Sequence, residues 1–427
     1  MRSGATLLAV GAGLTLVLGA GSARAQTEAG SRDIFARYAP GVVQVQILEA
    51  GSDSKQSIGS GFAVEPAGVF VTNYHVVASV VQHPDRYRAT LRVQDGSTYA
   101  ATVVAFDVVQ DLALVRSPEA PGRAFALHGG PALRKGERLF SLGNPLDLGM
   151  SVVEGTYNGL LEHSRYARIH FSGSLNPGMS GGPALLSGGE VAGVNVATAG
   201  DEVSFLVPVE HVGALLARAR ERGFEPPADL LTELRDQLLA QQSAYLADLL
   251  AQPLEEVRMG PYAAPTRLAP YFNCWGDAPV DEKAFFTQRV HACFTDDQVF
   301  VSEEQSFAIV ELHHRQVTST RISGRRFYAL YSTLYENDYS KRWGRETDYT
   351  PFECDTHFVE HGGLTFKTSF CARRYKRLDG LYDVVFKAAA LGRPSDGFET
   401  ALLLSGVALD PARALSRRIL ESIRWAE

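Results

Sequence analysis

The 427-residue chain has no cysteine before Cys274 and only four in all. It also lacks an excess of basic residues, because 41 lysines and arginines stand against 48 acidic residues, for a formal net charge of -7. Binding to phosphate backbones depends on clustered positive charge, so this balance argues against a nucleic-acid partner. With 45% hydrophobic and 21% charged residues, the composition is typical of a soluble, globular protein of two to three domains.

The apolar run at the start of the chain is too short to span a membrane. Residues 5–20 are apolar and rich in small side chains, and Arg2 precedes them. The run is shorter than the roughly 20 residues that a spanning helix needs. Ala23-Arg24-Ala25 then places small residues where a signal peptidase cleaves. We therefore expect a signal peptide over residues 1–25, export to the periplasm or the cell exterior, and no stable membrane insertion after cleavage; an uncleaved anchor is the alternative.

The four cysteines of an exported chain predict disulfide bonds. Three pairings are possible, and closeness in sequence favours Cys274 with Cys293 and Cys354 with Cys371. The alternative is a zinc site made by Cys354, His357, His361 and Cys371, whose spacing would suit that metal. Because an oxidising compartment favours disulfides, we expect no metal and no cofactor.

Helical periodicity is nearly absent between residues 41 and 208. Short apolar runs alternate with Gly, Asp and Asn, which predicts an all-β barrel or sandwich. The dipeptide Asp95-Gly96 between two such runs is a hairpin signal. Residues 117–122 contain two prolines and a glycine and divide the region into two halves, each able to close as a small barrel.

The pattern changes to helical spacing after residue 208. Residues 209–222 are periodic, and after Pro226-Pro227 a stripe of leucines continues to Leu249. We expect this stripe to pack against the barrels, with a partner or oligomer contact as the alternative. Beyond residue 260 the chain is aromatic-rich and strand-like. The predicted order is an all-β double-barrel domain at 26–225, a helical linker at 226–257, and a disulfide-containing α+β domain at 258–427.

The most specific chemical motif is Gly178-Met179-Ser180-Gly181-Gly182-Pro183. Its glycines permit a tight turn in which the backbone amides of Gly178 and Ser180 would form an oxyanion hole. Glycine-flanked serines are also common in ordinary turns, so the motif alone does not establish that Ser180 is a nucleophile.

A serine nucleophile needs a base and a group that orients the base. His75 follows an apolar β-run, where it would be the general base or a buried core residue. Asp111 directly precedes another apolar strand and would accept a hydrogen bond from the histidine; Asp107 is a competing candidate.

Residues 34–215 resemble HtrA-like, trypsin-fold serine proteases, because five segments occur in the order found in that family. They are Gly59-Ser-Gly-Phe-Ala-Val64, Thr72-Asn-Tyr-His-Val-Val77, Asp111-Leu-Ala-Leu114, Leu142-Gly-Asn-Pro145 and Asn176-Pro-Gly-Met-Ser-Gly-Gly-Pro183. The resemblance implies two perpendicular six-stranded barrels with the active site between them. It also implies that His75 is the general base, Asp111 rather than Asp107 its orienting carboxylate, and Ser180 the nucleophile.

The chain also departs from the HtrA pattern. No segment after residue 225 resembles the PDZ domain that usually follows the protease, so tail sensing and oligomer-based regulation are not carried over. Met179 stands where Asn is often found. Ser174, six residues before Ser180, would sit at the base of the primary specificity pocket, and it is small and uncharged. We expect small or medium apolar residues at the cleavage position, with Asn195, Val196 and Ala197 on the pocket wall.

These patterns predict an exported serine endopeptidase that acts on polypeptides through an acyl-enzyme. The alternative is a catalytically silent protease fold whose C-terminal domain carries a binding function. Nothing resembles the Gly-x-Ser-x-Gly elbow of lipases, so proteolysis is favoured over ester hydrolysis. The sequence leaves the oligomeric state open.

Overall fold

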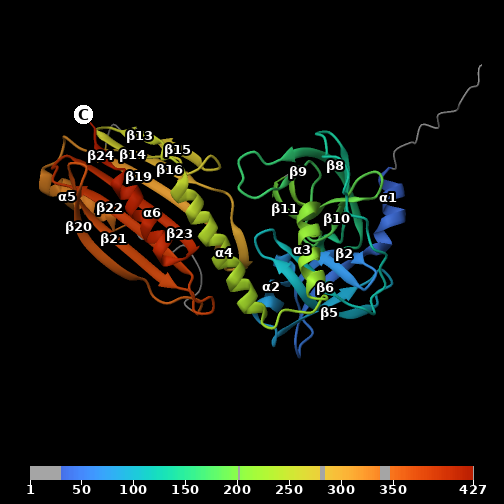
Figure 1. Ribbon diagram of the computed structural model, residues 1–427. Helices are drawn as coiled ribbons and strands as arrows, with labels where there is room; N and C mark the ends of the chain where they lie inside the picture. The colour runs from blue at the N-terminus through green and yellow to red at the C-terminus, as the bar shows by residue number, and fades with distance from the viewer. Residues whose placement is uncertain (1–29, 201, 279–283, 337–346, 427) are drawn as a thin grey trace, which may run out of the picture.

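The computed structural model of the protein describes residues 30–200, 202–278, 284–336 and 347–426, and of residues 197–200 it describes the backbone alone. The expected signal peptide, residues 1–25, lies outside the described residues. The chain forms two lobes, which we name the double-barrel lobe (residues 30–225) and the C-terminal lobe (residues 256–426) (Figure 1).

The double-barrel lobe contains two closed six-stranded barrels. The first has the order β1-β2-β3-β6-β5-β4, from β1 (Val42–Glu49), β2 (Lys55–Glu65), β3 (Val69–Thr72), β4 (Tyr87–Arg92), β5 (Thr98–Asp107) and β6 (Leu112–Arg116). The second has the order β10-β11-β12-β9-β8-β7, from β7 (Arg138–Gly143), β8 (Ser151–Leu160), β9 (Ile169–Phe171), β10 (Pro183–Leu185), β11 (Val191–Gly200) and β12 (Val203–Pro208). The predicted all-β double barrel is confirmed, and the break near residues 117–122 falls between the barrels.

Four helices accompany the barrels: α1 (Ser31–Tyr38), α2 (Tyr74–Gln82), α3 (Val209–Glu221) and α4 (Leu230–Ala251). Leu234, Leu238 and Leu249 of the predicted leucine stripe are fully buried. Helix α4 contacts α2 of the first barrel, but it also packs against the C-terminal lobe, so it joins the two lobes rather than covering the barrels alone (Figure 1).

The C-terminal lobe is built on a seven-stranded antiparallel sheet. Its order is β15-β16-β19-β23-β22-β21-β20, from β15 (Asn273–Asp277), β16 (Thr287–Phe294), β19 (Val310–Thr318), β20 (Glu353–His361), β21 (Leu364–Arg374), β22 (Tyr382–Leu391) and β23 (Asp396–Val407). Small sheets add β13 (Glu256–Met259), β14 (Tyr262–Pro265) and β24 (Arg424–Trp425), and the hairpin β17 (Val299–Ser302) and β18 (Gln305–Phe307). In the described part of this lobe, two helices accompany the sheets: α5 (Gly324–Tyr335) and α6 (Leu409–Glu421).

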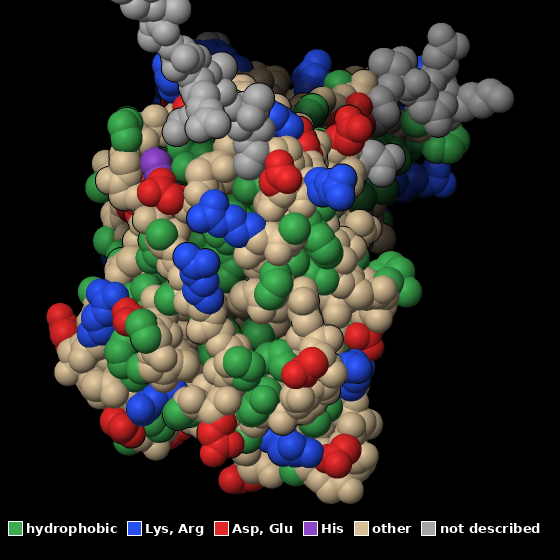
Figure 2. Space-filling view, turned by 90° about the vertical axis from the view of Figure 1, so that its right-hand side faces the viewer, with side chains coloured by type: hydrophobic (Ala, Val, Ile, Leu, Met, Phe, Trp, Pro, Cys, Tyr) green, Lys and Arg blue, Asp and Glu red, His purple; other side chains and the backbone are tan. Residues whose placement is uncertain are grey.

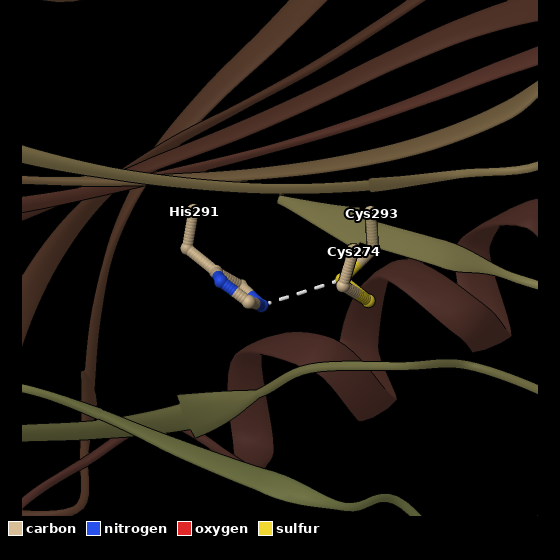
Figure 3. Close-up of side chains that lie close together, drawn as sticks. All are labelled: Cys274, His291 and Cys293. Atoms are coloured by element: carbon tan, nitrogen blue, oxygen red, sulfur yellow. Dashed lines mark hydrogen bonds between the residues drawn. A yellow bond between two sulfur atoms is a disulfide. The ribbon is translucent and has the colours of Figure 1, made fainter. Parts of the chain in front are cut away.

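Two disulfides tie neighbouring strands of this sheet. Cys274 bonds Cys293 between β15 and β16, and Cys354 bonds Cys371 between β20 and β21. Both predicted pairs are therefore present, and the sulfur atoms of the alternative zinc site are bonded to each other. His291 points at the first disulfide, with its Nε2 3.3 Å from the Sγ of Cys293 (Figure 3).

The charge distribution on the surface and the character of the helices complete the description of the fold. On the face of the double-barrel lobe that is turned away from the C-terminal lobe, acidic and basic side chains are interspersed (Figure 2). Within the described ranges, the structure contains no helix with the length and apolar character needed to span a bilayer.

Candidate active site

The N-terminal end of helix α2 brings His75 and Asp111 together. The first amides of a helix have no partner inside the helix. Here the Oδ1 of Asp111 accepts the backbone N–H of His75 at 2.8 Å, while its Oδ2 lies 2.7 Å from the imidazole Nδ1. The carboxylate therefore holds both the backbone and the ring of His75, and with Nδ1–H donating to it, Nε2 is the free basic nitrogen.

The position of Asp111 is itself fixed by a backbone turn. Its φ is 58°, in the left-handed region that Asp tolerates better than most residues. Its carbonyl accepts a hydrogen bond from Nδ2 of the fully buried Asn73 at 2.7 Å. The competing Asp107 lies elsewhere, because its Oδ2 pairs with Arg218 at 3.0 Å. The structure thus places Asp111, and not Asp107, on His75.

The pKa of His75 is raised above its ordinary value of 6.5. Burial opposes the charged ring, but the negative charge of Asp111 and the hydrogen bond to it outweigh that effect. The arrangement therefore stabilises the protonated imidazole, which is the state a general base reaches after taking a proton.

Ser180 lies on a turn in which two positions, Gly178 and Gly181, accept only glycine. Gly178 has a φ of 95°, and a Cβ there would lie 2.4 Å from the carbonyl oxygen of Asn144. Gly181 has a φ of 86°, and a Cβ there would lie 2.2 Å from the carbonyl oxygen of Ser60. Among the described residues, neither the amide of Gly178 nor that of Ser180 has a protein acceptor, so both are available to an oxyanion.

The hydroxyl of Ser180 donates to the carbonyl of Val196 at 3.3 Å. In the part of the chain that the structure describes, it makes no hydrogen bond with His75. Such bonds are often long in unliganded enzymes and tighten when substrate binds.

Comparison with known proteins agrees with this geometry. Residues 59–194 match the family model of the trypsin-like peptidase domain. The double-barrel lobe is a trypsin-like peptidase domain of the HtrA type. The mitochondrial serine protease HTRA2 of Bos taurus is 32% identical over 203 residues, which cover 44% of this chain and 43% of that protein. The chloroplastic protease Do-like 1 of Arabidopsis thaliana is 32% identical over 206 residues, which cover 43% of this chain and 46% of that protein.

This chain therefore spans less than half the length of these relatives. Among solved structures, Deg5 is 27% identical and covers 44% of this chain and 92% of that chain, with a TM-score of 0.39.

In this HtrA-like domain, a buried serine to which the sequence analysis gave no role, Ser60, holds the serine turn. The Oγ of Ser60, in β2 of the first barrel, donates to the carbonyl of Gly178 at 2.7 Å and accepts the amide of Asn144 at 3.0 Å. The amide of Ser60 donates to the carbonyl of Ser180 at 2.7 Å. The sequence signal that could have pointed to this role is a hydroxyl between Gly59 and Gly61 at the start of an apolar run, because a buried polar group needs a partner.

The residues predicted for the specificity pocket occupy different environments. Ser174 is exposed, and its Oγ accepts the amide of Glu202 at 3.3 Å. Val196 is half-buried beside Ser180, and the side chain of Ala197 lies outside the described residues. Asn195 is fully buried, and its Nδ2 donates to the carbonyls of Leu142 and Met179 at 3.0 and 3.1 Å. Its side chain is therefore engaged inside the serine turn rather than offered to a substrate.

Proposed function

We propose that the protein is an exported serine endopeptidase that hydrolyses polypeptides through an acyl-enzyme intermediate. In this proposal Ser180 attacks the scissile carbonyl, His75 takes its proton and later gives it to the leaving amine, and Asp111 orients His75. The amides of Gly178 and Ser180 stabilise the oxyanion. The observation that carries the proposal is the two-point attachment of Asp111 to His75 in a domain whose serine turn keeps two amides without a protein acceptor.

Export to the periplasm or the cell exterior is supported by the first 25 residues and by the two disulfides. A preference for small or medium apolar residues at the cleavage position is supported by the small, uncharged Ser174, which offers no counter-ion to Arg or Lys.

Covalent labelling with a fluorophosphonate probe tests the nucleophile. The mature protein should become labelled, and Ser180→Ala should abolish the labelling because the reacting oxygen is lost. Ser97→Ala is the matched control, since Ser97 is an exposed serine in a hairpin turn of the same domain, and it should label like the wild type.

The alternative function is a silent protease fold that only binds. It is favoured by one observation, the hydrogen bond of the Ser180 hydroxyl to Val196 in place of His75. A correctly folded wild-type protein that stays unlabelled would support this alternative and reject the peptidase proposal.

A further inference from the structure

The hairpin β17–β18 of the C-terminal lobe is built onto the helix that carries His75. The carbonyl of Val301 accepts two hydrogen bonds from α2, one from the hydroxyl of Tyr74 at 3.2 Å and one from Nε2 of Gln82 at 2.6 Å. Tyr74 directly precedes His75 and is fully buried. Two donors on one buried carbonyl fix the hairpin relative to the catalytic helix.

This anchoring places Phe300 beside His75. The two rings meet edge to face, with centroids 5.8 Å apart and an interplanar angle of 74°. The side chain of His75 nevertheless keeps 26% of its surface exposed. Phe300 therefore borders the candidate active site without sealing it.

A cavity of about 390 Å³ opens at this contact, and both lobes line it. The double-barrel lobe contributes His75, Ser57 of β2 and Ala78 of α2, and the C-terminal lobe contributes Phe300, Arg377 and Leu378. Arg377 links the two lobes at this cavity, because its guanidinium donates to the ring of His83 at 2.9 Å and to the carbonyl of Gln82. The size of the cavity is in the range of sites that take small molecules or side chains.

The position of the cavity indicates which part of a substrate would enter it. In the proposed mechanism the acyl part stays on Ser180, near Val196, and the leaving amine takes its proton from His75. The residue that follows the scissile bond must therefore lie next to His75. Phe300 is an aromatic side chain in contact with His75 there, and an aromatic surface favours an apolar contact.

Building on the proposed peptidase function, we propose that the C-terminal lobe completes the substrate cleft, with Phe300 as a specificity-determining residue for an apolar side chain immediately after the scissile bond. The lobe then acts as part of the enzyme's binding surface, in addition to the barrels.

Transfer of the acyl group from Ser180 to an added amine measures binding of the residue after the scissile bond, separately from binding of the residues before it. An ester substrate forms the acyl-enzyme at Ser180, and an added amino-acid amide then competes with water for it. The amine nitrogen attacks the ester carbonyl and loses a proton, the bond to the Ser180 oxygen breaks, and that oxygen regains its proton through His75. In the wild type, leucine amide should be a better acceptor than glycine amide, and Phe300→Ala in the full-length protein should reduce that preference about tenfold.

Two variants serve as controls. Phe300→Leu keeps an apolar side chain and should retain most of the preference. Phe358→Ala removes an aromatic residue of β20 that is 70% exposed, and it should behave like the wild type. The rate of fluorophosphonate labelling, which involves no residue after the scissile bond, is measured on all four proteins to report on the acyl side alone, and Phe358→Ala should label at the wild-type rate.

Three results would overturn the inference. An unchanged preference in Phe300→Ala would mean that Phe300 does not contact this residue. Faster labelling of Phe300→Ala would mean that the hairpin obstructs the site, and an equal fall in labelling and in both acyl transfers would mean that Phe300 only positions His75. These results differ from failure of the proposed function, in which the wild type itself would not label.

Discussion

At the scale of single residues, Asp111 joins local structure to chemistry. One carboxylate oxygen satisfies an amide in the first turn of α2 and the other holds the His75 ring, at 2.8 and 2.7 Å. The Asp111 carboxylate therefore binds both the end of the helix and the imidazole. Asn73 in turn fixes Asp111 by donating a hydrogen bond to its backbone carbonyl. Because the carboxylate also raises the pKa of His75, its removal should affect both rate and pH dependence.

We expect Asp111→Asn to lower kcat by about 10⁴-fold, because an amide no longer favours the tautomer that presents Nε2. Activity requires neutral His75, so wild-type kcat/KM should fall as the pH drops through a value above 6.5. Without the carboxylate only burial remains, which lowers the pKa, so the inflection should move to lower pH.

Initial rates on an ester substrate across neutral pH measure both effects. The control is Asp107→Asn, which breaks a partly exposed pair with Arg218 and should leave the profile unchanged. A wild-type rate or an unmoved inflection in Asp111→Asn would contradict the role assigned to this carboxylate.

At the scale of elements, the serine turn is held by strands from both barrels. Ser60 of β2 reaches it from the first barrel, and Asn195 of β11 reaches it from the second. Asn195 also accepts the hydroxyl of Ser141 at 2.7 Å. The relative position of the barrels thereby sets the shape of the oxyanion turn.

Asn195→Ala should destabilise the fold and slow the chemistry together. It removes a donor from the carbonyls of Leu142 and Met179, although Met179 keeps the amide of Gly182. It also leaves the buried hydroxyl of Ser141 without its acceptor, and an unsatisfied buried group costs about 1 to 3 kcal/mol of unfolding free energy. Urea denaturation and the fluorophosphonate labelling rate measure the two effects. Asn158→Ala in β8 is the control, because its side-chain bonds are longer, at 3.3 and 3.4 Å, and it should change neither quantity appreciably. Normal labelling of Asn195→Ala would show that the turn does not need this side chain.

The same elements show how far the sequence could predict this molecule. The barrels follow from local alternation and turn residues, and the pairing of His75 with Asp111 follows from two short motifs in known order. The contact of Phe300 with His75 joins residues that are far apart in sequence, and no local pattern encodes it. The sequence places Asn195 on the pocket wall, whereas its side chain is fully buried, because sequence position does not reveal which polar side chains are satisfied internally.

At the scale of the whole molecule, the C-terminal lobe contacts both barrels. The hairpin β17–β18 holds α2 of the first barrel, and Asp297 accepts the Ser164 hydroxyl and the Arg165 amide of the second barrel, each at 2.5 Å. Arg165 also pairs with Asp248 of α4 at 2.7 Å. Substrate binding at the cleft should therefore depend on the folded state of this lobe.

The stability of the C-terminal lobe should depend on Glu399, which is buried in its sheet. Burial raises the pKa of Glu399 to about 7 from an ordinary value of 4.5, although Arg315 partly offsets this at 3.3 Å. The folded lobe then holds a proton that the unfolded chain releases, so its stability should fall by roughly 3 kcal/mol as the pH rises through this interval. Glu399→Gln does not titrate, and it should flatten this part of the pH dependence.

All three tryptophans lie in residues 258–427, so tryptophan fluorescence during urea denaturation reports on this lobe. The free energy of unfolding is measured near pH 5 and near pH 7.5. Between the lower and the higher pH the wild type should lose stability, and Glu399→Gln should lose less. His75 also contributes stability that is lost as the pH rises through its raised pKa, but it is present in both proteins and cancels in the comparison. Glu360→Gln, at an exposed position of β20, is the control and should follow the wild type. If Glu399→Gln and the wild type lose equal stability over this interval, Glu399 is ionised in the folded lobe and Arg315 compensates for its burial fully.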